Sequence, residues 1–209
     1  FWYDVLLEVE GEDVTEFEKT VDAYYSSVDF PEDVTMTFSS IGLKGQGFEE
    51  THILSFVSPS SQSLANLRAS LSDEKWENYL DLVRPLVDNV RVSAGNASKV
   101  FNAEEFYPIG QVWGFKVKSK YIPQFTVAFE KLMQTFDAPG FVGLANVTHG
   151  ISNGENLLIY GTYPDLNSAF TFGPKNEAEA SAFAEFFNVT GEISEFTQSW
   201  TRVKIQDYN

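Results

Sequence analysis

The chain has 209 residues, enough for one large domain or two small ones. Its 30 acidic and 14 basic residues give a formal net charge of −16, which repels phosphate backbones and anionic lipids, so neither nucleic acid nor a membrane is expected as a partner. The absence of cysteine excludes disulfides, thiolate nucleophiles, iron–sulfur clusters and cysteine-type zinc sites.

The apolar runs are only a few residues long, whereas a bilayer-spanning helix needs about 20. The sequence begins with Phe1 rather than Met. Together with the acidic charge and the lack of cysteine, this favours an exported protein, periplasmic or extracellular, over a cytoplasmic one. An initiator Met directly before Phe1 in the native gene product would remove the main support for that expectation.

The first half of the chain predicts four strands and two helical regions. Residues 2–10 alternate apolar and polar side chains, as a half-buried strand does. Residues 13–28 place apolar side chains three and four apart, and Asp13 with Glu16 suits a helix N-cap with its reciprocal acid. The remaining elements are strands at 34–41 and 51–57, a helical region at 61–87 broken near 72–73, and a strand at 89–100.

The second half predicts the same order of elements. A linker of residues 101–110 precedes it, and Pro123 falls in the first turn of its first helix, where a missing N–H costs little. The helical stretch at 165–188 carries several phenylalanines that are expected to be core, although residues 170–174 are irregular enough to rim a pocket mouth instead. The full set is strand 111–118, helix 121–136, strands 140–148 and 156–163, helix 165–188 and strand 191–205.

The two halves also align with each other in sequence. Residues 28–31 match residues 136–139 at an offset of 108, and the offset falls to 103 near the ends, where Lys99 meets Arg202. Small loop deletions produce such a drift. We therefore predict a tandem duplication, with repeats at 1–103 and 104–209 packed as one compact unit.

Strand–helix–strand–strand–helix–strand is the ferredoxin-like order, so the fold class is α+β. Helices would cover one face of each antiparallel sheet, and packing the other faces together closes a barrel. This arrangement resembles the dimeric α+β barrel superfamily, of the antibiotic-biosynthesis monooxygenase-like and stress-responsive types, with the dimer fused in one chain. The resemblance covers almost all of the chain through element order, and it carries over no catalytic residue. It implies a space between the sheets for a small hydrophobic ligand, in a superfamily that includes cofactor-free oxygenases, isomerases and haem-handling enzymes.

The strand faces that point away from the helices supply the candidate ligand-binding residues. On the first strand these are Trp2, Asp4, Leu6 and Glu8, and on the matching strand of the second half they are Val112, Gly114, Lys116 and Lys118. The charged side chains either surround a polar ligand cavity or lie at a solvated rim, and the rim is favoured because charges are seldom interior. Trp200, which stands where the first copy has Ala97, makes the two halves inequivalent.

Two histidines offer further chemistry. His149 follows a strand, at the start of a polar loop, where it is either a general base or an ordinary loop residue. His52 is interpreted as a half-exposed edge residue. Haem ligation by either histidine is disfavoured because neither lies on a predicted helix. The candidate catalytic residues are Asp4, Lys116, His149 and Tyr160, and the candidate ligand-binding residues are Trp2, Glu8, Lys118 and Trp200.

The function expected from these features is the binding of a small hydrophobic compound, with cofactor-independent oxygenation or isomerisation as its enzymatic version. No cofactor and no metal are expected, because motifs for metals, phosphates, dinucleotides and nucleophile elbows are absent. The chain would act as a monomer or a homodimer. The alternative is a non-catalytic protein that presents surfaces to another protein.

Overall fold

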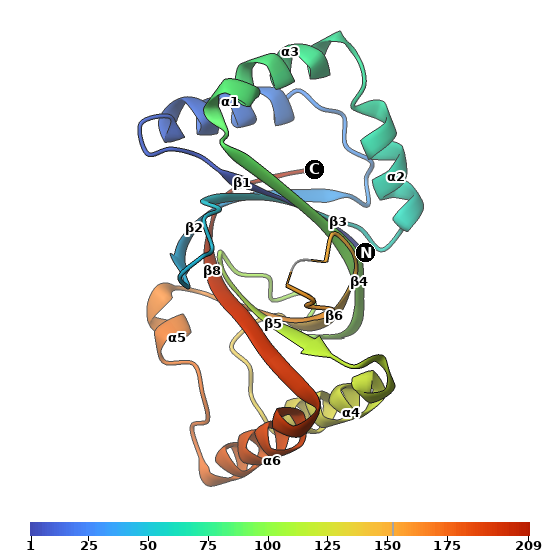
Figure 1. Cartoon of the computed structure of the whole chain (residues 1–209), viewed down its shortest axis with the longest axis vertical. Coiled ribbons are helices and arrows are strands. Elements are labelled where there is room, and N and C mark those ends of the chain that lie inside the picture. Colours follow the sequence, from blue (N-terminus) through green and yellow to red (C-terminus); the bar gives the residue numbers. More distant parts are fainter. Residues whose placement is uncertain (152) are drawn as a thin grey trace. The chain divides into compact units, whose positions relative to one another are not determined.

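The computed structural model describes residues 1–151 and 153–209, which form two compact units. Unit 1 consists of Phe1–Gly95 and Val203–Asn209, and unit 2 consists of Asn96–Arg202. Figure 1 colours the chain from the N-terminus to the C-terminus and labels its elements. The last seven residues of the chain therefore belong with its first half.

Unit 1 combines α-helices with one set of antiparallel strands. Strand β1 pairs with β3 on one side and with β4 on the other, and β3 pairs with β2. The elements are β1 (Trp2–Glu8), α1 (Val14–Tyr25), β2 (Thr35–Lys44), β3 (His52–Val57), α2 (Ser61–Ser70), α3 (Glu74–Val83), the short helix η1 (Arg84–Leu86), and parts of β4 (Asn89–Phe101) and β8 (Ser194–Tyr208).

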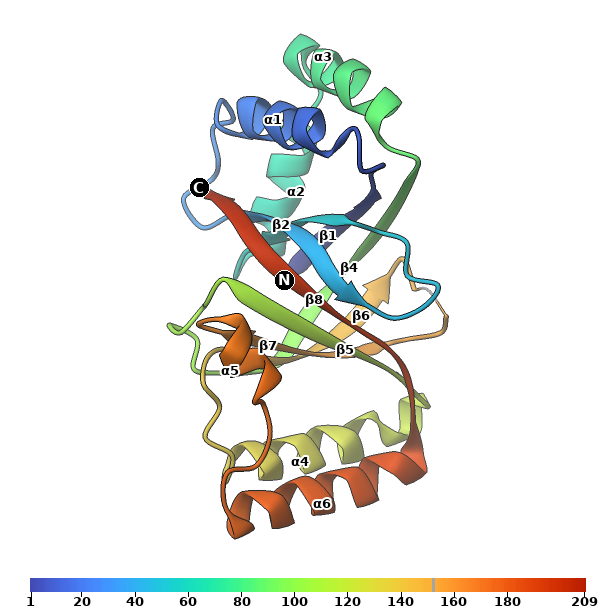
Figure 2. The ribbon, with the colours of Figure 1, turned by 90° about the vertical axis from the view of Figure 1, so that its left-hand side faces the viewer.

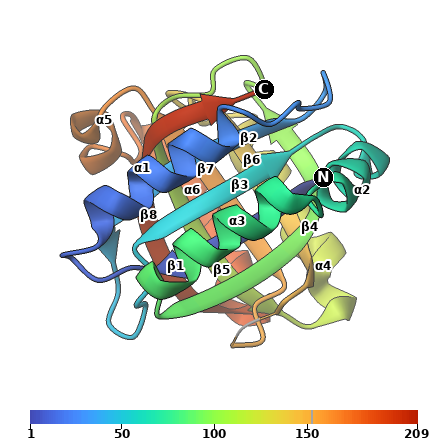
Figure 3. The same cartoon turned by 90° about the horizontal axis from the view of Figure 1, so that it is seen from above.

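The core of unit 1 lies between its strands and helices α1 and α3. Helix α1 buries Phe17, Val21 and Tyr25, which recur every four residues and so share one face. These side chains pack against Met36 and Phe38 of β2. Figure 3 shows α1 and α3 running side by side across the strands of this unit. The predicted helix-facing set of the first strand, which includes Leu7 and Val9, belongs to the same cluster.

Unit 2 repeats the arrangement. Helices α4 and α6 lie side by side in Figure 2, and strand β7 pairs with β5 and β6. Pro123 occupies the first turn of α4, as predicted. The elements are β5 (Ile109–Val117), the short helix η2 (Ser119–Tyr121), α4 (Ile122–Met133), β6 (Val142–His149), β7 (Leu157–Tyr163), α5 (Leu166–Phe170), α6 (Glu177–Ile193) and the remaining parts of β4 and β8.

The core of unit 2 also lies between helices and strands. Phe125 and Phe129 of α4 and Phe186 of α6 are buried against Leu144 and Leu157 of the strands. Trp113 packs against this cluster, which confirms that it faces the helices. Successive side chains of a strand point to opposite faces of the sheet. The residues that alternate with Trp113 on β5 and with Leu157 on β7 therefore point away from the helices.

The strands follow one another through their hydrogen bonds in the order β1-β3-β2-β8-β5-β7-β6-β4, which closes into a barrel. Strands β4 and β8 each contribute to both units, because the unit boundaries fall within them. The α+β class and the closed antiparallel barrel predicted from the sequence are confirmed. The repeat boundary between residues 103 and 104 concerns ancestry and stays a prediction.

Several local predictions are wrong. Asp13 occupies the predicted N-cap position of α1, but the side-chain capping hydrogen bond expected there is not formed. The stretch 165–188 is not one helix: α5 ends at Phe170, and α6 begins at Glu177 and continues to Ile193. Phe170 and Phe187 are 69% and 60% exposed rather than core, although Phe187 contacts the rings of Phe183 and Phe186.

None of the helices in the described part of the chain combines the length and the apolar character that crossing a bilayer requires.

Candidate functional site

The candidate residues of β1 lie on the strand face that points away from the helices of unit 1. Asp4 pairs across the sheet with Ser55 of β3 and Ser93 of β4, and it is half-buried. Glu8, at the end of the strand, is half-buried as well. The indole Nε1 of Trp2 is buried, and it has no hydrogen-bond partner among the described residues. A buried donor of this kind costs about 1–3 kcal/mol unless a ligand or a water accepts from it.

The two candidate lysines of unit 2 are exposed. The Lys116 side chain is 55% exposed, and its Nζ lies 3.7 Å from Oε2 of Glu195. Lys118 comes directly after β5 and precedes the short helix η2. Exposure at both positions favours the solvated-rim interpretation for these lysines. An exposed pair of this kind adds little free energy of folding.

The two histidines occupy very different surroundings. His149 is exposed at the end of β6, where its Nδ1 lies 3.0 Å from Oγ1 of Thr148. His52 is only 2% exposed, so its predicted half-exposed position is wrong. Its side chain projects from β3 toward α1 and packs against Phe17 and Phe38.

Both ring nitrogens of His52 already face protein groups. Nδ1 lies 2.9 Å from Oγ1 of Thr51, and Nε2 lies 3.4 Å from Oε1 of Glu18. Burial lowers the pKa of His52 against the opposing effect of Glu18. These surroundings do not suit an axial haem ligand, which needs a ring nitrogen directed at the iron. Within residues 1–151 and 153–209 no cluster of three or more His, Asp or Glu side chains is arranged to hold a metal ion.

Tyr160 forms a hydrogen-bonded pair with a buried arginine. It lies on β7, and Arg202 of β8 donates hydrogen bonds to its hydroxyl oxygen from Nε, at 3.0 Å, and from Nη2. Arg202 is only 2% exposed. A guanidinium stays protonated in proteins, so this pair places a positive charge beside a phenol in a buried position.

Aromatic rings surround the Tyr160–Arg202 pair. The guanidinium carbon of Arg202 lies 5.6 Å from the ring centre of Phe106 and 5.5 Å from that of Tyr160. Phe141 lies 5.9 Å from the Tyr160 ring and 5.4 Å from the Phe106 ring. We call Phe106, Phe141, Tyr160 and Arg202 the Tyr160 cluster. Contacts of a cation with ring faces at these distances are attractive.

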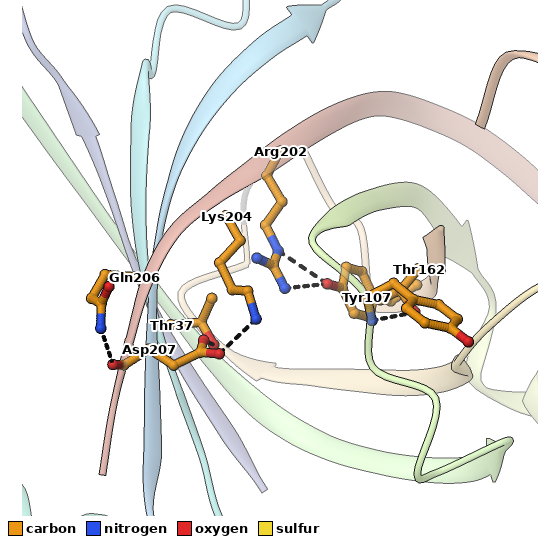
Figure 4. A network of polar contacts seen from close by, with 8 residues as sticks. Thr37, Tyr107, Thr162, Arg202, Lys204, Gln206 and Asp207 are labelled. Carbon is orange, nitrogen blue, oxygen red and sulfur yellow. Dashed lines mark hydrogen bonds and ion pairs between the residues drawn. The ribbon is translucent and has the colours of Figure 1, made fainter. Parts of the chain in front are cut away.

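Hydrogen bonds hold the segment that carries Phe106. The backbone N–H of Tyr107 donates to Oγ1 of Thr162 at 3.3 Å, and this hydroxyl donates to the carbonyl of Glu105 at 3.1 Å. Figure 4 shows Arg202, Tyr107 and Thr162 close together, with the Tyr107 hydroxyl directed away from Arg202. Thr162 is 1% exposed, so these bonds are shielded from water.

Two glycines of β5 make room for polar groups on the face opposite the helices. A Cβ on Gly110 would come within 2.9 Å of Arg202 Nε and still closer to the Tyr160 hydroxyl. A Cβ on Gly114 would collide with the carboxylate of Glu155. Glu155 is 7% exposed and accepts hydrogen bonds from Thr197 Oγ1, at 2.8 Å, and from Gln198 Nε2, at 2.7 Å.

Sequence reasoning named Tyr160 and Trp200 but missed Arg202, Glu155 and Phe106. The alignment of the two halves matches Arg202 with Lys99, but Lys99 forms an ion pair with Glu130 at 2.6 Å in which both side chains are more than one third exposed. Trp200 is buried on β8, two residues before Arg202. The glycine spacing on β5 was visible in the sequence and, with an arginine on another strand, could have indicated the cluster.

The described geometry can stabilise negative charge on a ligand oxygen. The Tyr160 hydroxyl oxygen accepts from Arg202, and a phenol hydroxyl is a donor as well as an acceptor. A hydroxyl polarised by an adjacent guanidinium is a stronger donor than an isolated phenol, and donors fixed in this way stabilise developing oxyanions.

No protein-family model matches the chain, and a search of curated proteins finds no match. Solved structures do match over nearly its whole length. Two of them are named "putative monooxygenase": one from Fusobacterium nucleatum subsp. nucleatum (TM-score 0.70, 11% identity, 100% of this chain and 93% of that one) and one from Lactobacillus acidophilus (TM-score 0.67, 12% identity, 100% and 95%). A third, named an anthrone oxidase-like protein, has a TM-score of 0.65 at 10% identity and covers 99% of this chain and 91% of its own.

Identities this low show a shared fold and nothing finer. Together with the strand order and the helices packed against the strands of each unit, they establish that this chain has the dimeric α+β barrel fold, built from two ferredoxin-like repeats in a single polypeptide.

Proposed function

We propose that the chain binds a small hydrophobic compound that carries a phenolic or enolisable oxygen, with the Tyr160 cluster as the anchor for that oxygen. The observation that carries the proposal is the buried guanidinium of Arg202 on the Tyr160 hydroxyl, among the rings of Phe106 and Phe141. The rings suit an apolar ligand body, and the paired donors suit its oxygen.

In its enzymatic form the proposed activity is cofactor-independent oxygenation or isomerisation. Both reactions start when a carbon-bound or oxygen-bound proton leaves the substrate and an enolate or phenolate remains. A positive charge beside the anionic oxygen lowers the free energy of that intermediate. The Tyr160 hydroxyl and the Arg202 guanidinium would supply this stabilisation.

The anthrone oxidase-like structural neighbour suggests a concrete substrate for the first assay. Anthrone loses the two hydrogens of its methylene carbon and gains one oxygen atom, so anthrone and one O₂ give anthraquinone and one water. The substrate itself supplies the electrons, and no external reductant is needed. Tyr160 and Arg202 would hold the anthrone oxygen as it becomes the enolate.

The test compares oxygen uptake and ligand binding by the whole chain in metal-free buffer. Anthrone is the oxygenation substrate, and 2-naphthol and its methyl ether are the binding probes. We expect 2-naphthol to bind more tightly than the ether. Tyr160→Phe should weaken 2-naphthol binding about tenfold, as the loss of one strong hydrogen bond of about 1.4 kcal/mol does.

Tyr107→Phe is the matched control, because it removes a hydroxyl that points away from Arg202 in the same unit. Its affinity for 2-naphthol should equal that of the unmodified chain. Arg202→Gln extends the test if it folds, since it removes the charge as well as the donors. Equal binding of naphthol and ether, unaffected by Tyr160→Phe, would contradict the proposed anchor.

The alternative of a non-catalytic interaction protein makes the opposite prediction. Such a chain would bind none of these probes and would consume no oxygen with anthrone. Binding without oxygen uptake would support the ligand-binding function alone and would argue against the oxygenase.

A further inference from the structure

Unit 2 contains a cavity of about 100 Å³ on the side of its strands that faces the helices. Ile159 and Gly161 of β7 line it. Tyr160 lies between them in the sequence and projects from the opposite face of the strand, because strand side chains alternate. The cavity is therefore distinct from the Tyr160 cluster. Helices α4 and α6, seen together in Figure 2, supply much of the remaining wall.

Aromatic rings dominate the lining. Phe172, from the segment between α5 and α6, lies 5.3 Å from the Trp113 ring, 5.4 Å from Phe136 and 6.0 Å from Phe183, measured between ring centres. Among the described lining residues, the Tyr163 hydroxyl and the Trp113 indole N–H are the side-chain groups capable of ordinary hydrogen bonds. A water molecule needs two to four polar partners, so such a cavity disfavours water.

The size and the accessibility of the cavity suit a small guest. Dry apolar cavities of about 150 Å³ take up benzene or xenon, and the present one has about two thirds of that volume. Two of its lining residues, Phe172 and Phe187, are 36% and 60% exposed. The cavity thus reaches the protein surface at these rings, and a guest does not have to cross a packed core to enter.

We propose that this cavity is a binding site for one small, uncharged, apolar molecule with the dimensions of a single aromatic ring. Edge-to-face contacts with Trp113, Phe136 and Phe172 would hold the ring, as they hold aromatic pairs within proteins. The site does not depend on the proposed anchor at Tyr160.

Gly161 offers a position from which a substitution places side-chain atoms in the cavity. A Cβ at this position would lie 3.5 Å from the Trp113 ring and from the Tyr163 hydroxyl, which is ordinary van der Waals contact. Gly161→Val would place its methyl groups in the cavity and leave no space for a ring. Gly191→Ala is the control, because a Cβ at Gly191 in α6 meets nothing within 4 Å.

The experiment measures benzene binding to the whole chain by the rise in melting temperature with benzene concentration, and it locates the site in crystals under xenon pressure. We expect xenon in the cavity, equal benzene affinity for the unmodified chain, Gly191→Ala and Tyr160→Phe, and a loss of about tenfold or more in Gly161→Val. If Gly161→Val does not fold, Gly161→Ala should show a smaller loss in the same direction.

An unmodified chain that takes up neither xenon nor benzene would overturn the proposal and identify the cavity as a packing void. Full benzene affinity in Gly161→Val would overturn it as well, because the guest would then be bound elsewhere. A loss of 2-naphthol binding in Tyr160→Phe with benzene binding intact would separate this site from the proposed function.

Discussion

His52 is buried in its neutral form because its surroundings penalise a charge more than they stabilise it. The ring packs between Phe17 and Phe38 and is 2% exposed. Burial lowers its pKa, Lys44 acts in the same direction, and Glu18 opposes both. The ordinary value for histidine is about 6.5, so the unfolded chain binds a proton at a pH where the folded chain does not.

Because of His52, the free energy of unfolding should therefore decrease as the pH is lowered. The contribution of neutral His52 is fully present above pH 6.5 and is lost as the pH falls toward the lowered pKa of the folded state. Urea titrations between pH 8 and pH 5 measure the slope. His52→Leu should flatten it. An equal slope in His52→Leu would assign the acid sensitivity to other groups.

At the scale of elements, the sequence predicted the order of strands and helices because its apolar residues show the period of two of a strand and the period of 3.6 of a helix. The buried residues of α1 and α4 recur at spacings of three and four, as expected. The boundaries after Tyr163 were missed, although Gly173 and Pro174 interrupt the helical pattern in the sequence. These two residues and the cap of α6 at Asn176 separate α5 from α6.

The cap of α6 is reciprocal. The Asn176 side-chain oxygen accepts from the Glu179 backbone N–H at 2.9 Å, and the Glu179 carboxylate accepts from Asn176 Nδ2 at 2.9 Å and from the Lys175 N–H at 2.7 Å. Glu179 is 5% exposed. A buried carboxylate needs these donors, so the cap also stabilises Glu179.

Asn176→Ala should reduce the free energy of unfolding by about 1–2 kcal/mol, because it removes the cap and one donor to Glu179. Asp13→Ala is the matched control at α1, where no side-chain cap bond exists, and should cost only a few tenths of a kcal/mol. Urea denaturation at pH 7 measures both changes in the free energy of unfolding. Equal losses in the two variants would show that the observed hydrogen bonds do not decide helix stability here.

At the scale of the whole molecule, neither half of the sequence contains a complete unit. Unit 1 needs Val203–Asn209, which extend β8 beside β2. Tyr208 is buried within the unit 1 cluster, and its hydroxyl donates to Asp22 Oδ1 at 2.9 Å. The repeated order of elements was recognisable in the sequence. The sharing of β4 and β8 was not, because strand partners depend on contacts between residues far apart in the chain.

A chain that ends at Arg202 should lose at least about 3 kcal/mol of unfolding free energy, since it loses a buried aromatic side chain and the strand next to β2. A chain that ends at Tyr208 lacks only the exposed Asn209 and should match the full sequence. Tyr208→Phe keeps the ring and should cost about 1 kcal/mol. Undiminished stability after truncation at Arg202 would show that unit 1 does not depend on the end of the chain.

The candidate site could also be predicted only in part, because its residues could be assigned to strands but their contacts join residues far apart in the chain. Tyr160 was nominated from its own strand, but its partner Arg202 lies 42 residues further along the chain. Of the charged candidates, Lys116 lies on β5, as predicted, whereas Lys118 lies just beyond the end of that strand at the start of η2, and both side chains are exposed. The alternation of side chains along a strand predicts the face of the sheet to which each side chain points. It does not predict which side chains of other strands it contacts on that face.

The position of Val203–Asn209 in unit 1 also bears on how the protein is made. On the ribosome, residues 1–95 emerge first, but the strand beside β2 emerges only after Asn96–Arg202 have been synthesised. At about 5–20 residues per second, this leaves the edge of β2 without its neighbour for roughly 5–20 s. An unpaired strand edge is a template for aggregation, so the nascent chain has a defined interval in which a chaperone would protect it.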